Sequence, residues 1–282
     1  MMTTTKLSSG FLGAVKFCMR LERPDADISG LGFVPVSFLL PVVIYVDRSP
    51  EPLNITGANS YLDTVHFKEG GIDCRHLRQS QLKALLSGYS DKRYLPIIRF
   101  PAADGEHRDS IIASVENLLH RQAGYGHNIE IGVKYIISET IDNIAEHSGS
   151  PVGFIVAQSY DGFTDVCIAD MGRTILGGYK GNGRTAEISS DMEAIQAATE
   201  GLSSKNRPDA ENRGFGIRTT QKMLIQGLGG EYLLASGGAV FATNRHGAQY
   251  LELPPGMRLE GTFSAFRIPH NAAGFNYMQF VE

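Results

Sequence analysis

The sequence predicts an α/β fold of the α+β type: a mixed, mainly antiparallel sheet covered on one face by helices. Two long segments, residues 108–122 and 128–147, carry apolar residues at helical spacing. After them come two pairs of strand-like segments, joined by the turn sequences Asp161-Gly162 and Gly237-Gly238. A two-layer sandwich buries the apolar side of both kinds of element, so it is the expected architecture.

Length and composition limit the class of protein. The chain has 282 residues, and at about 150 residues per domain this favours two domains. A hydrophobic content of 42% with 20% charged residues excludes a disordered or collagen-like chain. The formal net charge of -4 disfavours non-specific binding to nucleic acid or to an anionic membrane.

The cysteines and the apolar segments point to a cytoplasmic protein. Cys18, Cys74 and Cys167 are far apart and form no C-x-x-C pair, which suits a reducing compartment. The longest apolar stretch, residues 31–46, is interrupted by prolines and is shorter than the roughly 20 residues that span a bilayer. We therefore expect no membrane segment.

The first part of the chain, residues 1–102, is predicted to be a small α/β domain. The continuous apolar run from Val42 to Val46 is typical of a strand that is buried on both faces. A helix is expected over residues 77–86 and a second strand over residues 94–100. The small and polar residues 102–105 make a plausible linker to a second domain, residues 103–282.

The second part follows a definite order of elements. After the two long helices we expect strands and one short helix at these positions: strands 152–160, 164–170, 232–236, 239–243, 249–253 and 262–268, and a helix at 217–226. The stretch from Gly177 to Gly216 is polar and rich in glycine, and we expect it to be mobile.

The second long helix carries a polar stripe that could do chemistry. Glu139, Asn143 and His147 are spaced i, i+4, i+8, and they are turned away from the apolar stripe of Val133, Ile137, Ile141 and Ile144. Such a stripe can simply be a solvated helix face. It can also be a site in which the Asn143 amide oxygen binds a hard cation while Glu139 polarises a water.

Three further segments carry candidate binding residues. Asp170 ends an apolar strand, and Gly172 lets the backbone turn after it; the pair is either an ordinary turn or a carboxylate placed to accept from an exocyclic amine. Arg213-Gly214-Phe215-Gly216 precedes a helix, and is either a flexible loop or a phosphate cradle. Thr262 begins the last strand, where its hydroxyl could join Asp170.

In this order and spacing, the motifs resemble the ATPase family of DNA gyrase, ninety-kilodalton heat-shock chaperones, histidine kinases and mismatch-repair ATPases, the GHKL family. Residues 138–147 resemble its asparagine box, residues 170–172 its first glycine box, and residues 213–217 its second. The resemblance covers about residues 105–270 and is closest to histidine-kinase-like and anti-sigma-type bacterial proteins. Residues 61–67 resemble the anti-sigma-antagonist-like domains found beside such modules.

The resemblance implies a role for each motif. Asn143 would bind Mg²⁺, Asp170 would read the adenine amine of ATP with help from Thr262, and Glu139 would be the general base. The cofactor-binding set would be completed by His147, Gly172, Thr174, Arg213, Gly214, Phe215 and Gly216. The stretch from Gly177 to Arg213 would be the lid. Thr174 stands where the family has the second glycine of its first glycine box, and Asn212 where many members have a glycine.

Three functions are compatible with these motifs. The first is a regulatory protein that binds ATP and Mg²⁺ and hydrolyses ATP slowly, with lid closure controlling how the domains or a protein partner dock. The second is a serine/threonine protein kinase of the anti-sigma type that uses the same site. The third is an interaction module without enzymatic activity. A protein partner or self-association is expected in each case.

Overall fold

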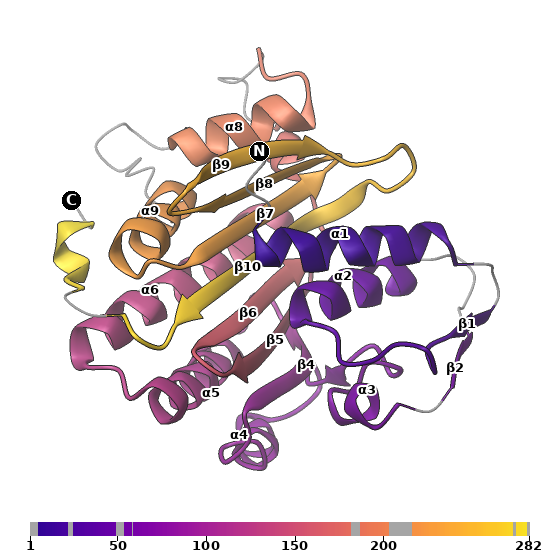
Figure 1. The fold of residues 1–282 in the computed structure, drawn as a ribbon, viewed down its shortest axis with the longest axis vertical. Coiled ribbons are helices and arrows are strands. Elements are labelled where there is room, and N and C mark those ends of the chain that lie inside the picture. The colour runs from indigo at the N-terminus through magenta and orange to yellow at the C-terminus, as the bar shows by residue number, and fades with distance from the viewer. Residues whose placement is uncertain are drawn as a thin grey trace.

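One large sheet organises the computed structural model of the chain (Figure 1). The structure describes residues 5–21, 25–48, 54–57, 59–181, 187–202, 216–272 and 275–280. Within these residues the sheet has eight strands in the order β3-β4-β5-β6-β10-β7-β8-β9. Only β3 and β4 pair in parallel, and the other neighbours are antiparallel. The predicted fold class, α/β with a mixed and mainly antiparallel sheet, is confirmed.

The strands of this sheet are β3 (Ile72–Asp73), β4 (Tyr94–Pro101), β5 (Val152–Tyr160), β6 (Phe163–Asp170), β7 (Glu231–Gly237), β8 (Ala239–Asn244), β9 (Gly247–Glu252) and β10 (Leu259–Pro269). A separate parallel pair is formed by β1 (Asp25–Asp27) and β2 (Asn54–Thr56). The helices are α1 (Lys6–Met19), α2 (Val36–Asp47), α3 (Ser60–Thr64), α4 (Gln79–Ser87), α5 (Gly105–Ala123), α6 (His127–Asn143), η1 (Ile144–Ser148), α7 (Ile175–Lys180), α8 (Asp191–Glu200), α9 (Gly216–Lys222), η3 (Met223–Gly227) and η4 (Tyr277–Gln279).

Helices cover both faces of the sheet. Along β5, Phe154 and Val156 face the core formed with α1 and α2, whereas Ile155 and Ala157 face the core formed with α5 and α6. The alternation follows from the period of two of a strand, and every one of these side chains is buried. The expected cover on one face is present, and the N-terminal helices α1 and α2 add a layer on the other (Figure 1).

The predicted strand at Val42–Val46 is wrong, because these residues belong to helix α2. The helix begins after Pro35 and contains Pro41, and its residues from Val36 to Ile44 are all buried. It packs against α1 on one side and against β5 and β6 on the other. A helix that is apolar all round gives the same continuous apolar run as a buried strand, so hydrophobic pattern alone cannot separate the two.

Most of the other predicted elements are confirmed. The helix expected at residues 77–86 is α4, and the strand at 94–100 is β4. Both hairpins turn at the predicted sequences, Asp161-Gly162 and Gly237-Gly238. The long helix α5 has Asp104 as its N-cap, whose carboxylate accepts from the N–H groups of Glu106 and His107, and Gly124, with φ +60°, as its C-cap. The linker expected at residues 102–105 is therefore wrong at its end, since Asp104 and Gly105 start this helix. Helix α6 and the following π-helical turn η1 cover the second predicted long helix.

The mobile stretch expected from Gly177 to Gly216 contains regular structure. Helix α8 is capped by Ser190, whose hydroxyl accepts from the Glu193 N–H while the Glu193 carboxylate accepts from the Ser190 N–H. Ala194 and Ile195 of this helix are fully buried, and the helix lies against β7 and β8. Residues 182–186 and 203–215 of the stretch lie outside the described residues.

The sheet runs across the predicted domain boundary near residue 102. Strand β4 pairs with β5 along its length, from Tyr94↔Gln158 to Pro101↔Val152. Strands that precede the boundary therefore share one sheet with those that follow it. The division into domains 1–102 and 103–282 stays a prediction.

Candidate functional site

Helix α6 brings two of the candidate polar residues to the same face. Glu139 and Asn143 are each half-buried, whereas Val133, Ile137 and Ile141 are at most 1% exposed on the opposite stripe. The helix changes to a π-helical turn at Ile144, so His147 lies in η1 rather than in the regular continuation of α6. The Nε2 atom of His147 is 3.9 Å from a carboxylate oxygen of its neighbour Glu146.

The start of α9 lies against this polar face. A Cβ atom placed on Gly216 would be 3.2 Å from Oε2 of Glu139 and 3.4 Å from Nδ2 of Asn143. Since a side chain at position 216 would press on both groups, glycine lets the backbone approach them closely. The other members of the predicted phosphate cradle, Arg213, Gly214 and Phe215, lie outside the described residues.

Asp170 is a buried carboxyl group with a shifted pKa. It is 2% exposed, and its carboxylate accepts from the backbone N–H groups of Gly172, at 2.8 Å, and of Thr262. Burial raises the pKa of Asp170 to about 7, although these hydrogen bonds oppose the rise. A carboxylate has about four lone-pair positions, so acceptor capacity remains after the two backbone bonds.

Ser148 connects the Asp170 turn to the end of η1. Its hydroxyl donates to the Ile144 carbonyl at 2.8 Å and also lies within hydrogen-bonding reach of the Asp170 carboxyl. Because the hydroxyl has a single proton, it donates to one of these two acceptors at a time. The Ser148 carbonyl accepts from Arg173 N–H at 2.6 Å. A Cβ on Gly172 would be 2.8 Å from the Ser148 carbonyl carbon, so the turn after β6 packs directly on η1.

Strand β10 completes the surroundings of Asp170. Gly261 has φ +75°, and a Cβ there would lie 2.5 Å from Oδ1 of Asp170. The Ser236 hydroxyl donates to the Gly261 carbonyl at 2.7 Å and accepts from Ile175 N–H at 3.0 Å. Thr174 caps α7 by accepting from Gly177 N–H at 3.1 Å. The Asp170 turn, the α7 start, β7 and β10 are therefore joined by hydrogen bonds.

The structure thus places the candidates in two groups joined by η1. The first group is Glu139, Asn143 and Gly216, and the second is Asp170, Gly172 and Thr262 with Thr174 close by in the chain. Sequence reasoning missed Ser148 as a neighbour of Asp170. The available signal was its position immediately after His147, at the end of the polar stripe.

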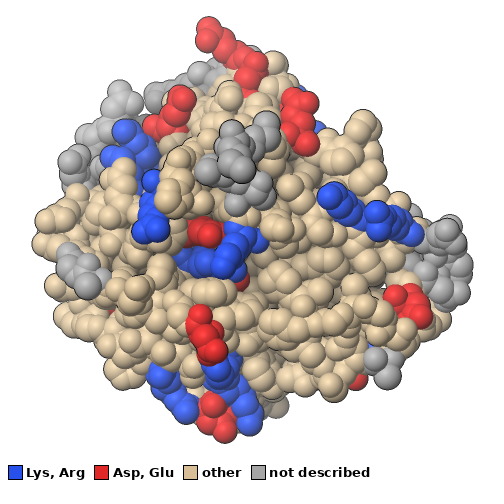
Figure 2. Space-filling view, in the orientation of Figure 1, with Lys and Arg blue, Asp and Glu red and all other residues tan. Residues whose placement is uncertain are grey.

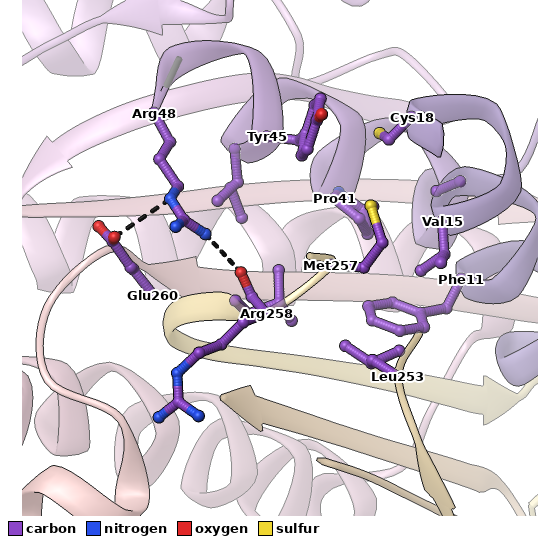
Figure 3. A pocket seen from close by; sticks show the side chains of 13 residues that line it. Phe11, Val15, Cys18, Pro41, Tyr45, Arg48, Leu253, Met257, Arg258 and Glu260 are labelled. Atoms are coloured by element: carbon purple, nitrogen blue, oxygen red, sulfur yellow. Dashed lines mark hydrogen bonds and ion pairs between the residues drawn. The ribbon is translucent and has the colours of Figure 1, made fainter. Parts of the chain in front are cut away.

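A second feature lies where α2 ends, beside an apolar pocket (Figure 3). Phe11, Val15 and Cys18 of α1, with Pro41 and Tyr45 of α2, face the segment that joins β9 to β10. At the rim, Nε of Arg48 is 3.1 Å from the Glu260 carboxylate, and the Arg48 guanidinium also donates to the Arg258 carbonyl.

The same segment is also tied to helix α8. The Arg258 guanidinium pairs with the carboxylate of Asp191, the first residue of α8, which also accepts from Gly238 N–H at 2.9 Å. Gly261 and Thr262 follow next in the chain. The β9–β10 connection therefore contacts α2, α8 and the surroundings of Asp170.

The donor set around α6 fits Mg²⁺. The Asn143 amide oxygen and the Glu139 carboxylate are hard oxygen ligands, and Mg²⁺ in nucleotide sites commonly takes one or two protein oxygens together with phosphates and water. Among the described residues, no cluster of three or more His, Cys, Asp and Glu side chains is placed to hold a metal by itself. A magnesium ion here would complete its coordination with phosphate oxygens or water.

On the face that carries α1 and α2, Lys and Arg lie in separate groups, some of them beside Asp or Glu (Figure 2). None of the described helices combines the length and apolar character needed to cross a membrane. The expectation that nucleic acid is not a partner stays a prediction.

Comparison with known proteins does not assign the chain to a family. No family model and no curated protein matches it. The geometry of the site is therefore the basis for any functional conclusion.

Proposed function

We propose that the protein is a regulatory protein that binds ATP with Mg²⁺ and hydrolyses ATP slowly. The observation that carries the proposal is that four separate chain segments meet in two pairs linked by η1: α6 with the start of α9, and the turn after β6 with the start of β10. Each contributes a residue type that suits one part of a magnesium nucleotide. The resemblance to the gyrase and histidine-kinase ATPase family assigns those same positions.

The proposed roles follow from the chemistry of each group. Asp170 accepts a hydrogen bond from the exocyclic amine of adenine, a contact for which its remaining acceptor capacity is suited. Asn143 contributes its amide oxygen to Mg²⁺, which neutralises phosphate charge. Gly216 allows the α9 backbone to approach the phosphates, and its closeness to Glu139 and Asn143 supports that role.

Slow turnover is supported by the start of α7. Thr174, which stands where the family has a glycine, holds Gly177 N–H with its hydroxyl, and Ile175 N–H is held by Ser236. The bond to Ser236 ties this segment to β7 and opposes movement of the segment that would have to close over the nucleotide. Glu139 is the proposed general base, since its carboxylate lies on the same polar face as Asn143.

A regulatory output is supported by the contacts of the β9–β10 connection. Asp191 lies at the start of α8, inside the proposed lid, and pairs with Arg258. Arg48, at the end of α2, donates to the Arg258 carbonyl of the same connection and pairs with Glu260 at the start of β10. A change in lid position would therefore alter the contacts that hold the N-terminal helices, which gives nucleotide binding a route to domain or partner docking.

The test measures phosphate release and phosphate transfer together. Wild type is expected to release phosphate from ATP slowly. Glu139→Ala should release it at least about 100-fold more slowly, as expected when a general base is removed. Glu130→Ala, on the first turn of the same helix, is the matched control and should keep wild-type turnover. Transfer of labelled phosphate to a protein would instead identify the serine/threonine kinase. If wild type neither releases nor transfers phosphate, the ATPase proposal is overturned.

A further inference from the structure

Strand β9 forms one end of the large sheet and pairs on one side only. Among the described residues it has β8 as its neighbour, and the sheet order ends with it. Its six residues, Gly247–Glu252, are exposed or half-buried throughout. The opposite end of the sheet is formed by β3, which has only two residues. Strand β9 is therefore the longer of the two edges.

The register with β8 shows which backbone groups point away from the sheet. Val240 pairs with Leu251 and Ala242 with Gln249, and Leu253 N–H donates to the Gly238 carbonyl at 2.8 Å. In an antiparallel pair, alternate residues direct both their N–H and C=O toward the neighbour. The residues between them, Ala248, Tyr250 and Glu252, accordingly direct their N–H and C=O outward.

This edge lacks three features that often protect an edge strand, and its one charged residue, Glu252, lies at its end. Natural edges carry proline, lysine or a bulge that prevents pairing with another chain. The sequence Gly-Ala-Gln-Tyr-Leu-Glu contains neither proline nor lysine, and its pairing with β8 runs without a register shift. The outward side of β9 is thus a surface prepared for a further strand.

We propose that β9 pairs antiparallel with β9 of a second copy of this chain, related by a two-fold axis. Centring the pair on Tyr250 places Ala248 opposite Glu252 of the second copy, so all three outward residues of each strand have backbone partners. Shifting the register toward the C-terminus would place Ala248 opposite Pro254, which has no N–H. In the register centred on Tyr250 the strand is therefore complementary to itself across the two-fold axis.

Side-chain charge agrees with this pairing. Glu252 is the only charged residue of β9, and the register places it opposite Ala248, not opposite the other Glu252. The diagonal neighbours of Glu252 on the same side are His246 and Tyr250 of the second copy, and neither is acidic, so like charges do not meet. Tyr250 packs on Phe241, with 4.9 Å between ring centroids, and its hydroxyl is hydrogen-bonded to that of Thr199, so the two Tyr250 residues meet through their backbones.

The first experiment measures the mass of the full chain by light scattering across a dilution series. Wild type is expected to be a dimer that dissociates on dilution. Ala248→Pro removes an outward N–H, and Ala248→Ser is the matched control that keeps it. Loss of the two symmetry-related hydrogen bonds should raise the dimer dissociation constant about five- to 150-fold in the proline variant. A wild-type monomer throughout, or a dimer that Ala248→Pro leaves unchanged, would overturn the proposal.

A second measurement needs no variant and decides the matter if Ala248→Pro does not fold. Amide hydrogen exchange in wild type should be slow at Ala248, Tyr250 and Glu252 at high protein concentration and faster after dilution. Gln249 and Leu251, whose amides face β8, should stay protected at both concentrations. Rapid exchange of the outward amides at the highest concentration would refute the pairing, whatever the state of the nucleotide site.

Discussion

Replacing Gly261 by alanine tests the packing around Asp170 most sharply. The residue has φ +75°, a conformation that costs a side-chain-bearing residue about 1–2 kcal/mol. The added Cβ would lie 2.5 Å from Oδ1 of Asp170 and 2.7 Å from its carbonyl carbon, and such overpacking costs about a further 1–3 kcal/mol. We expect Gly261→Ala to lower the free energy of unfolding by about 2–5 kcal/mol.

The measurement is urea unfolding followed by circular dichroism, with Gly256→Ala as the matched control. Gly256 has φ +86°, but no atom beyond its chain neighbours lies within 4 Å of its Cβ position. Its alanine variant should lose only the conformational part, about 1–2 kcal/mol. Equal losses in the two variants would refute the close approach of Gly261 to Asp170.

Two further predictions concern buried carboxylates. Since the pKa of Asp170 is raised to about 7, its contribution to stability is full below about pH 3.8 and is lost as pH rises through 7. ATP binding uses the ionised form, so the affinity measured by calorimetric titration should rise about tenfold from pH 6 to pH 8. The Asp170→Asn variant should lack this rise. Asp165 pairs bidentately with Arg267 at 2.7 and 2.8 Å, so Asp165→Ala leaves a buried charge without its partner. The variant should lower the free energy of unfolding in urea by about 3–5 kcal/mol. The control Asp91→Ala, which removes an exposed ion pair, should lower it by less than about 1 kcal/mol.

Local signals in the sequence were sufficient for the elements that surround the site. The hairpins of β5 with β6 and of β7 with β8 are specified by glycine-containing turns between apolar strands, and α5 by the helical spacing of its apolar residues. The position of Asp170 at the end of β6 follows from the same reasoning. These features depend on residues that are close in the chain, so the sequence pattern carries them.

Features that depend on distant residues were not predicted. Helix α2 was read as a strand because its environment, α1 on one side and the sheet on the other, makes it apolar all round. The capping sequence from Ser190 to Glu193 was a local signal for α8 that the glycine-rich surroundings obscured. Contacts such as those of Gly216 with Glu139 and of Ser148 with Asp170 come from tertiary packing and leave no mark on spacing.

The central claim is that Asp170 belongs to a site for ATP, and calorimetric titration with ATP and Mg²⁺ tests it most directly. Wild type is expected to bind, and Asp170→Asn to bind about 10- to 150-fold more weakly, because a hydrogen bond to a charged acceptor contributes about 1.5–3 kcal/mol. Absence of binding to wild type, or equal affinity of the two proteins for ATP, would contradict the account.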